Sequence, residues 1–230
     1  MSVPHLNAAS ESFPLESFAE AGRSSTRPAP RGVPLYATAK RALDLAVALP
    51  ALVLLTPLLL VLGALIRLES EGPALFRQTR LGRGGVPFTI LKLRTMTVEE
   101  NGSVIRQATA NDARITRIGR LLRAFSFDEL PQLLNVVKGE MSLVGPRPHA
   151  EAHDVFYGGL IGHYGLRQTV KPGITGWAQI HGHRGETPTL ADMRARVDLD
   201  AWYAAHAGFA LDLLILLRTP YEVLRRRNAY

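Results

Sequence analysis

The chain has 230 residues, which suits one domain of ordinary size and is too short for a multidomain assembly. It carries 27 Lys and Arg, of which 23 are Arg, against 20 Asp and Glu, so the net charge of +7 indicates a phosphate-rich or anionic partner. The absence of cysteine excludes a disulfide framework, a thiol nucleophile and a thiolate metal site, and an aromatic content of only 7% disfavours a nucleic-acid surface built on base stacking.

The N-terminal third is predicted to contain a tail and a membrane helix. Residues 1–34 mix Ser, Ala, Pro and Gly without a sustained period, which is typical of a disordered tail. Residues 35–67 are expected to form the helix, because the 22 residues of 45–66 carry no charge and suffice to cross a hydrocarbon core of about 30 Å. Pro57, which follows Thr56 near the middle, is expected to bend it.

The charges on both sides of this helix favour a re-entrant topology. A spanning helix should have one flank poor in Lys and Arg. Here Lys40 and Arg41 precede the apolar run, and Arg67 opens a second basic flank directly after it. We therefore predict that the helix enters the membrane, bends near Thr56 and Pro57 and returns to the same face. A straight transmembrane span is the alternative, because periodicity alone does not distinguish the two.

The domain that follows, residues 68–230, begins with its most basic part. Residues 67–123 hold 11 Lys and Arg against five Asp and Glu, where they can meet anionic membrane lipids and phosphates. Within this part, two β-prone runs flank a Gly-rich turn, which predicts a hairpin. Alternation puts Lys92 and Arg94 on one strand face, an arrangement that suits a phosphate. Residues 113–125 have the spacing of a basic amphipathic helix that lies on a membrane.

The remaining elements are mostly helical. A short helix is expected between Pro131 and Gly139, a longer one from Thr189 with an approximate capping box at Asp192, and an interfacial or core helix over residues 210–227. These elements predict an α+β fold that is mostly helical, with a small β-hairpin and one N-terminal re-entrant membrane helix.

The adjacent carboxylates Asp128 and Glu129 are the strongest candidates for chemistry. One interpretation is structural, a capping box in which Ser126 and Glu129 satisfy backbone amides, although Pro131 would then fall inside the helix so started. In the other, the pair lies at a helix N-terminus amid cations. There Asp can attack phosphorus, and Glu can hold Mg²⁺ together with substrate phosphates.

Two further segments carry candidate binding residues. A Gly-Pro-Arg-Pro turn fixes the backbone on both sides of Arg147, whose guanidinium could clamp a phosphate bidentately or be merely exposed. The loop over residues 171–182, which has three glycines and a proline around Trp177, contributes Gln179 as a weaker candidate.

Together these segments resemble the bacterial sugar transferase family, the monotopic polyprenyl-phosphate phosphoglycosyl transferases. The likeness runs from Lys40 to Tyr230 through KRALDL, the membrane helix with a central proline, FRQTRLGRGG, FTILKLRTM, NDARITRIGRLLRAFSFDELPQLLNVVKGEMSLVGPRP and KPGITGWAQIHG. Downstream, PRPHAEAH and GHRGETPTLADMRARVDLD are similar to the branch that transfers glucose 1-phosphate to undecaprenyl phosphate.

The resemblance implies an Mg²⁺-dependent enzyme on the cytoplasmic face of the bacterial inner membrane. It would transfer a sugar 1-phosphate, with glucose expected, from a UDP-sugar to undecaprenyl phosphate, releasing UMP in the first step of exopolysaccharide repeat-unit synthesis. Galactose or an N-acetylhexosamine are the alternative sugars. A non-catalytic membrane-anchored scaffold is the rival function, and a membrane-tethered nucleic-acid binder is third. The oligomeric state does not follow from the sequence.

The resemblance also implies a role for individual residues. Asp128 would be the nucleophile, forming a phosphosugar–aspartyl intermediate, and Glu129 the Mg²⁺ ligand. Arg123 and Arg147 would bind phosphates, and Pro57 would be the apex of the re-entrant helix. From strand face and loop position, the weaker binding candidates are Lys92, Arg94 and Gln179.

Overall fold

The computed structural model describes residues 34–97 and 112–225, so the predicted N-terminal tail lies outside the described residues. The fold is α+β, as predicted. The helices are α2 (Pro34–Glu69), α3 (Arg117–Phe125), α4 (Gln132–Lys138), α5 (Glu151–Leu160), α6 (Trp177–Ile180), α7 (Leu190–His206) and α8 (Phe209–Arg225). The strands are β1 (Leu75–Leu81), β2 (Pro87–Leu93), β3 (Ser142–Val144) and β4 (Gly173–Thr175), and the 3₁₀ turns are η1 (Arg83–Gly85), η2 (Phe127–Glu129) and η3 (Tyr164–Thr169).

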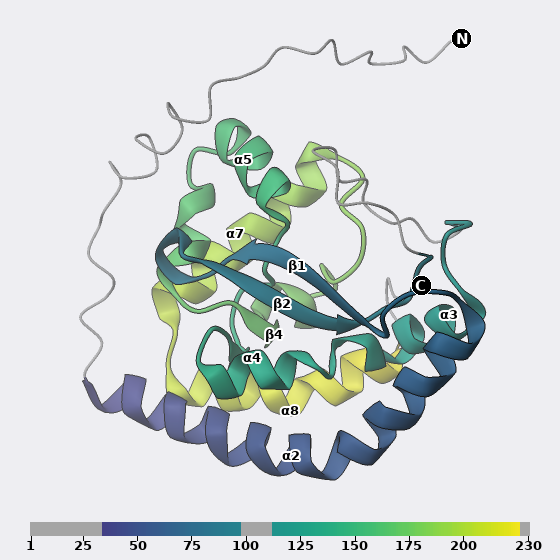
Figure 1. The fold of residues 1–230 in the computed structure, drawn as a ribbon. Coiled ribbons are helices and arrows are strands. Elements are labelled where there is room, and N and C mark those ends of the chain that lie inside the picture. Colours follow the sequence, from purple (N-terminus) through teal and green to yellow (C-terminus); the bar gives the residue numbers. More distant parts are fainter. Residues whose placement is uncertain (1–33, 98–111, 226–230) are drawn as a thin grey trace, which may run out of the picture.

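The long helix α2 bends near its middle, where the sequence predicts a bend (Figure 1). Pro57 lies inside the helix and has no N–H to donate to the carbonyl of Val53. The Thr56 hydroxyl donates to the carbonyl of Leu52 at 2.7 Å, a back-bond that often accompanies helix bending. The bend divides α2 into two arms.

The first arm is attached to the globular domain through polar side chains. Lys40 Nζ donates to Asp212 Oδ2 at 2.7 Å, and Arg41 donates to the carbonyl of Val136 at 2.6 Å. Asp44, only 3% exposed, accepts hydrogen bonds from Ser142 Oγ and the Leu143 N–H, both at 2.9 Å. These interactions hold the start of α2 against α8, α4 and β3.

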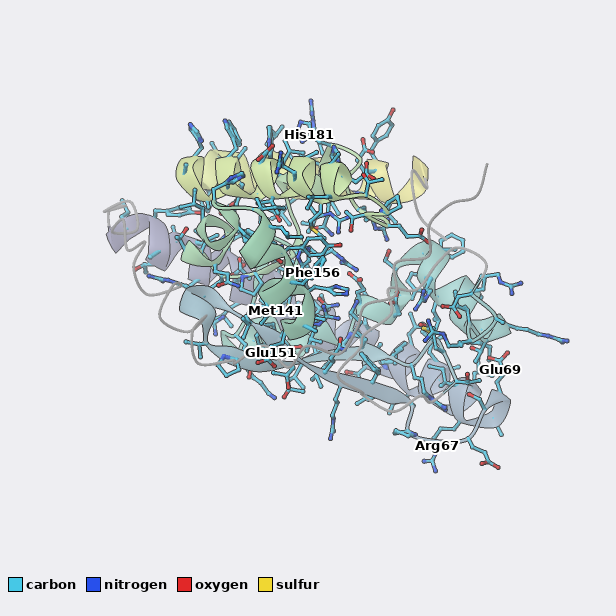
Figure 2. All side chains as sticks on the ribbon, turned by 90° about the horizontal axis from the view of Figure 1, so that it is seen from above. Arg67, Glu69, Met141, Glu151, Phe156 and His181 are labelled. Carbon is cyan, nitrogen blue, oxygen red and sulfur yellow. The ribbon has the colours of Figure 1, made fainter. Side chains whose placement is uncertain are left out.

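The second arm is attached to the same domain by apolar packing and a helix cap. Leu62 and Ile66 pack with Leu93 and Leu122 in a buried cluster. Glu69, labelled in Figure 2, accepts hydrogen bonds from the first backbone amides of α3, including the Arg117 N–H at 2.8 Å. A carboxylate at this position also interacts favourably with the helix dipole.

Both ends of α2 contact the same domain, which limits how the helix can lie in a membrane. A straight 36-residue helix would be about 54 Å long and would carry its ends to opposite sides of a bilayer. Instead the two arms return to the same folded body (Figure 1). Between them the helix exposes large aliphatic side chains such as Val53, Leu54 and Leu60, and its apolar stretch is long enough to enter a membrane. The chain is therefore membrane-associated.

The strands and central core lie on the inner side of α2. β1 and β2 form the predicted antiparallel hairpin, and its Phe88 and Ile90 join a buried cluster with Met141, which lies in the interior of the domain (Figure 2). β3 and β4 form a short parallel pair that sequence patterns did not predict, because three-residue strands carry no readable alternation. A side chain on Gly173 would lie 2.1 Å from the Gly145 nitrogen, so the two backbones approach this closely only with glycine.

We predict that Asp44→Ala destabilises the protein by about 1–3 kcal/mol, because the Ser142 hydroxyl and the Leu143 N–H would lose their partner in a buried site. The matched control is Asp198→Ala, which removes an exposed carboxylate paired with His163 and should cost at most about 1 kcal/mol. Thermal unfolding in detergent micelles measures both. Equal losses from the two variants would contradict the role given to Asp44.

Candidate active site

The two carboxylates Asp128 and Glu129 lie in η2, between the basic helix α3 and the short helix α4. Ser126 ends α3 in a left-handed conformation with φ 58° and ψ 24°, which turns the chain so that both carboxylates are buried in the domain. The Ser126 side chain makes no capping hydrogen bond, and Glu129 bonds to side chains rather than to a backbone amide. The capping-box interpretation is therefore wrong.

Glu129 is held by two cations from separate elements. Lys92 of β2 donates to Glu129 Oε1 at 3.0 Å, and Arg147 donates to both carboxylate oxygens, with Nη1 to Oε2 at 2.9 Å. Burial alone would raise the pKa of Glu129, but the charges of Arg147 and Lys92 outweigh it and hold that pKa well below its usual range. Glu129 is consequently ionised at neutral pH.

Asp128 lies in a different environment. Burial, followed by the negative charge of Glu129, raises its pKa to about 6, although Lys92, Arg147 and Arg123 act in the opposite direction. Among the described residues, no hydrogen-bond donor contacts its carboxylate. Several cations therefore lie near Asp128, but none of them forms a direct ion pair with it. The pKa of Asp128 is raised and that of its neighbour Glu129 is lowered, and such a separation between two adjacent carboxylates is typical of acid–base and nucleophilic sites.

The hairpin brings only one of its two candidate cations to this site. Burial lowers the pKa of Lys92, an effect that the charge of Glu129 partly offsets. Arg94 follows the end of β2, and its guanidinium instead donates to the carbonyls of Ser70, Glu71 and Gly72 beyond the end of α2. The expectation that Lys92 and Arg94 share one phosphate does not fit this placement, because strand alternation no longer applies where the strand has ended.

The other predicted residues lie near the carboxylates. Arg123 donates through Nε to Thr95 Oγ1 at 2.9 Å, and its charge acts on Asp128. Gln179 donates to the carbonyl of Ile174 at 3.0 Å and lines a pocket together with Glu129. The site therefore collects residues from β2, α3, η2, the Gly-Pro-Arg-Pro turn and α6.

Two buried or partly buried arginines escaped the sequence analysis. Arg167 of η3, only 4% exposed, donates to the backbone carbonyl of Arg147 and forms an ion pair with Asp200 at 3.0 Å. It thereby holds the turn that presents Arg147 to Glu129. Arg184 lines the pocket beside Glu129. Arg167 lies outside the quoted motifs and periodic patterns. Arg184 lies in the segment GHRGETPTLADMRARVDLD, which was used for the resemblance as a whole without assigning a role to this residue.

Glu129 is the residue suited to a divalent cation. Among the described residues, no cluster of three His, Asp or Glu side chains could hold a metal by itself. Glu129 Oε2 accepts a single hydrogen bond there, from Arg147, and retains acceptor capacity. Mg²⁺ is commonly bound by one or two carboxylates and the phosphates of a substrate. The donor set therefore fits Mg²⁺ only when bound phosphates supply further oxygens.

Known proteins are similar in sequence to this chain over most of its length. The family model described as bacterial sugar transferase matches residues 35–226. A UDP-glucose:undecaprenyl-phosphate glucose-1-phosphate transferase from Caulobacter vibrioides is 53% identical over 83% of this chain and 72% of its own length. The Escherichia coli protein of the same name is 47% identical over 86% of this chain and 44% of its own length. A UDP-N-acetylgalactosamine-undecaprenyl-phosphate N-acetylgalactosaminephosphotransferase from Aeromonas hydrophila is 39% identical over 83% of this chain and 45% of its own length.

We predict opposite effects on stability for the two carboxylates at pH 8 without Mg²⁺. Because the pKa of Asp128 is raised from 3.8 to about 6 on folding, its ionisation costs stability as pH rises through this window. Asp128→Asn should therefore stabilise the protein by roughly 2–3 kcal/mol at pH 8 and have little effect at pH 4. Glu129→Gln should destabilise it by about 3–5 kcal/mol, because Arg147 and Lys92 lose their buried partner.

Thermal unfolding of both variants in detergent micelles with a chelator measures these effects. A loss of stability in Asp128→Asn at pH 8 would contradict the conclusion that the surroundings of Asp128 disfavour its ionised form.

Proposed function

The chain belongs to the bacterial sugar transferase family, and we propose that it transfers glucose 1-phosphate from UDP-glucose to undecaprenyl phosphate, releasing UMP. Relatives from Caulobacter vibrioides and Escherichia coli carry this activity in their names. The chain spans 72% of the first and 44% of the second. The observation that carries the proposal is the Asp128 carboxylate, which accepts no hydrogen bond from any described residue, beside a Glu129 held by two cations.

The proposed reaction proceeds in two displacements at one phosphorus atom. In the first, an Asp128 oxygen forms a bond to the sugar-bearing phosphorus of UDP-glucose, and the bond from that phosphorus to the bridging oxygen breaks, so UMP leaves with the electron pair. In the second, an oxygen of undecaprenyl phosphate attacks the same phosphorus, and Asp128 leaves as a carboxylate. The products are UMP and the undecaprenyl diphosphate sugar, and the enzyme is regenerated.

The surrounding cations support this chemistry. A carboxylate and a diphosphate repel each other, so their approach requires compensating positive charge that is already in place. Arg147 and Lys92 would supply it next to Asp128, and Arg123 would add a third charge. Their present partner, Glu129, would then hold Mg²⁺ with the substrate phosphates. When bound, Mg²⁺ would neutralise the charge that develops on the departing phosphate.

The membrane helix would set the depth of the site. UDP-glucose is soluble in water and undecaprenyl phosphate is embedded in the bilayer, so the catalytic carboxylate must lie at the interface. A re-entrant α2, with both arms attached to the domain, is supported by the hydrogen bonds of Lys40, Asp44 and Glu69. The basic residues on both flanks favour the cytoplasmic face of the inner membrane and contact with anionic lipids.

The comparisons also support an alternative sugar, N-acetylgalactosamine, in place of glucose. The relative from Aeromonas hydrophila is named for N-acetylgalactosamine and is 39% identical to this chain. The same two displacements would serve an N-acetylhexosamine or galactose, because the sugar does not take part in bond making at phosphorus. A panel of UDP-sugars would identify the substrate through the rate of UMP release.

We predict that Asp128→Asn lowers UMP release from UDP-glucose by roughly three orders of magnitude or more, because the nucleophile is lost. In the wild-type protein, kcat/KM should rise with pH as Asp128 ionises near pH 6, and chelation of Mg²⁺ should abolish turnover. The exposed Asp198→Asn is the control and should retain activity. Undiminished turnover in Asp128→Asn would refute the nucleophile, and absence of UMP release from every UDP-sugar would indicate a scaffold instead.

We predict that the two sides of α2 share one compartment. Because the chain has no native cysteine, His5→Cys and Glu151→Cys each introduce a single thiol, before α2 and on the domain respectively. A membrane-impermeant maleimide should label both from the cytoplasmic side only. Labelling of the two cysteines from opposite sides would require a straight transmembrane span.

A further inference from the structure

A pocket beside η2 is lined by both polar and aliphatic side chains. Ser126 and Glu129, which lie two residues before and one residue after Asp128 in the chain, line it together with Arg184. Most of its surface is aliphatic, and the aliphatic residues are Leu130, Leu133, Ile174, Ile180 and Val223, while Thr175, Thr219 and Glu222 add further polar groups. The pocket thus joins the charged site to a predominantly apolar surface.

Three buried polar atoms of residues that line this pocket have no hydrogen-bond partner among the described residues. They are Ser126 Oγ, Gln179 Oε1 and Arg184 Nη1. A buried donor without an acceptor is unfavourable, and in a pocket wall it indicates a ligand that supplies the acceptor. Because the donor belongs to the positively charged guanidinium of Arg184, an anionic ligand suits it best. Burial lowers the pKa of Arg184, and the negative charges of Glu129 and Asp128 oppose that effect, so the guanidinium lies within electrostatic reach of the catalytic carboxylates.

α8, one of the elements that line the pocket, also lies beside the apolar helix α2 (Figure 1) and contacts it. Thr219, Glu222 and Val223 of α8 line the pocket, whereas Leu214 and Leu217 on the same helix are exposed. An amphiphile held in the membrane could therefore reach the pocket along α8 with its charged end leading.

We propose that this pocket receives the acceptor: Arg184 binds the phosphate of the polyprenyl phosphate, and the aliphatic side chains contact the isoprene unit next to it. The inference rests on the proposed function and adds where its second substrate binds. The aliphatic side chains that make up most of the pocket surface offer no hydrogen-bond partner to a uracil or a sugar ring, whereas an isoprene unit needs none. From this position the lipid phosphate would approach the phosphorus carried by Asp128.

The two half-reactions allow the inference to be tested separately from the proposed function. Exchange of labelled UMP into UDP-glucose without lipid reports the first displacement, and UMP release with undecaprenyl phosphate reports the complete reaction. Arg184→Gln should raise the KM for undecaprenyl phosphate by about tenfold or more and leave the exchange rate within about twofold. Arg184→Lys should restore part of the affinity. The exposed Arg194→Gln on α7 is the matched control and should change neither measurement.

A second variant tests the aliphatic part of the pocket. Val223→Asp places a charge next to the proposed isoprene unit and should raise the KM for undecaprenyl phosphate while the UMP exchange persists. A lower exchange rate in Arg184→Gln with an unchanged KM for the lipid would overturn the inference and assign Arg184 to the nucleotide. Unchanged values in both variants would also overturn it. No exchange in the wild-type protein would refute the covalent mechanism itself, whatever the variants do.

Discussion

The ionised carboxylate of Glu129, buried against Arg147 and Lys92, is the interaction on which the site depends. A buried charge is tolerated only when cations and hydrogen bonds compensate for its lost hydration, so the elements that carry these cations must meet at one place. The hairpin supplies Lys92. The turn that supplies Arg147 is fixed by the close contact of Gly145 with the β4 segment and by Arg167. Both cations are engaged by Glu129, and among the described residues no donor pairs with its neighbour Asp128, whose pKa is raised by burial and by the charge of Glu129.

The proposed function poses a second physical problem, the placement of charged chemistry at the surface of a bilayer, which the attachment of α2 would solve. Lys40 and Asp44 turn inward to the domain rather than toward lipid, where unpaired charges would be costly. At the other end, Glu69 caps α3 and apolar residues pack beneath it. The bend at Pro57 permits both attachments with one continuous helix. The helix that associates with the membrane therefore also shapes the domain. The C-terminal end of α2 holds α3, which leads directly into η2.

One proposed substrate is soluble in water and the other is a lipid, and the surroundings of Asp128 likewise include both a charged and an apolar part. The charges of Lys92, Arg147 and Arg123 act on Asp128 and suit a diphosphate. Its chain neighbours Ser126 and Glu129 line a largely aliphatic pocket in which Arg184 Nη1 has no hydrogen-bond partner among the described residues, an arrangement that suits an amphiphilic phosphate. A mechanism in two displacements requires a nucleophile that both substrates can reach in turn. A carboxylate close to both a group of cations and a largely aliphatic pocket meets that requirement.

The sequence by itself determined the features that depend on short stretches of chain: the hairpin, the bend at Pro57, the capping box at Thr189 and the end of α4 at Gly139. These arise from turn chemistry, helix caps and periodicity, which act over a few residues. The sequence also singled out Asp128 and Glu129, but it left a structural cap and a charged site as alternatives. Only the tertiary structure decided between them, because the partners of Glu129 lie 37 and 18 residues away in the chain. Arg94, expected at the site, and Arg184, not expected there, were placed by the same long-range packing, which no local pattern encodes.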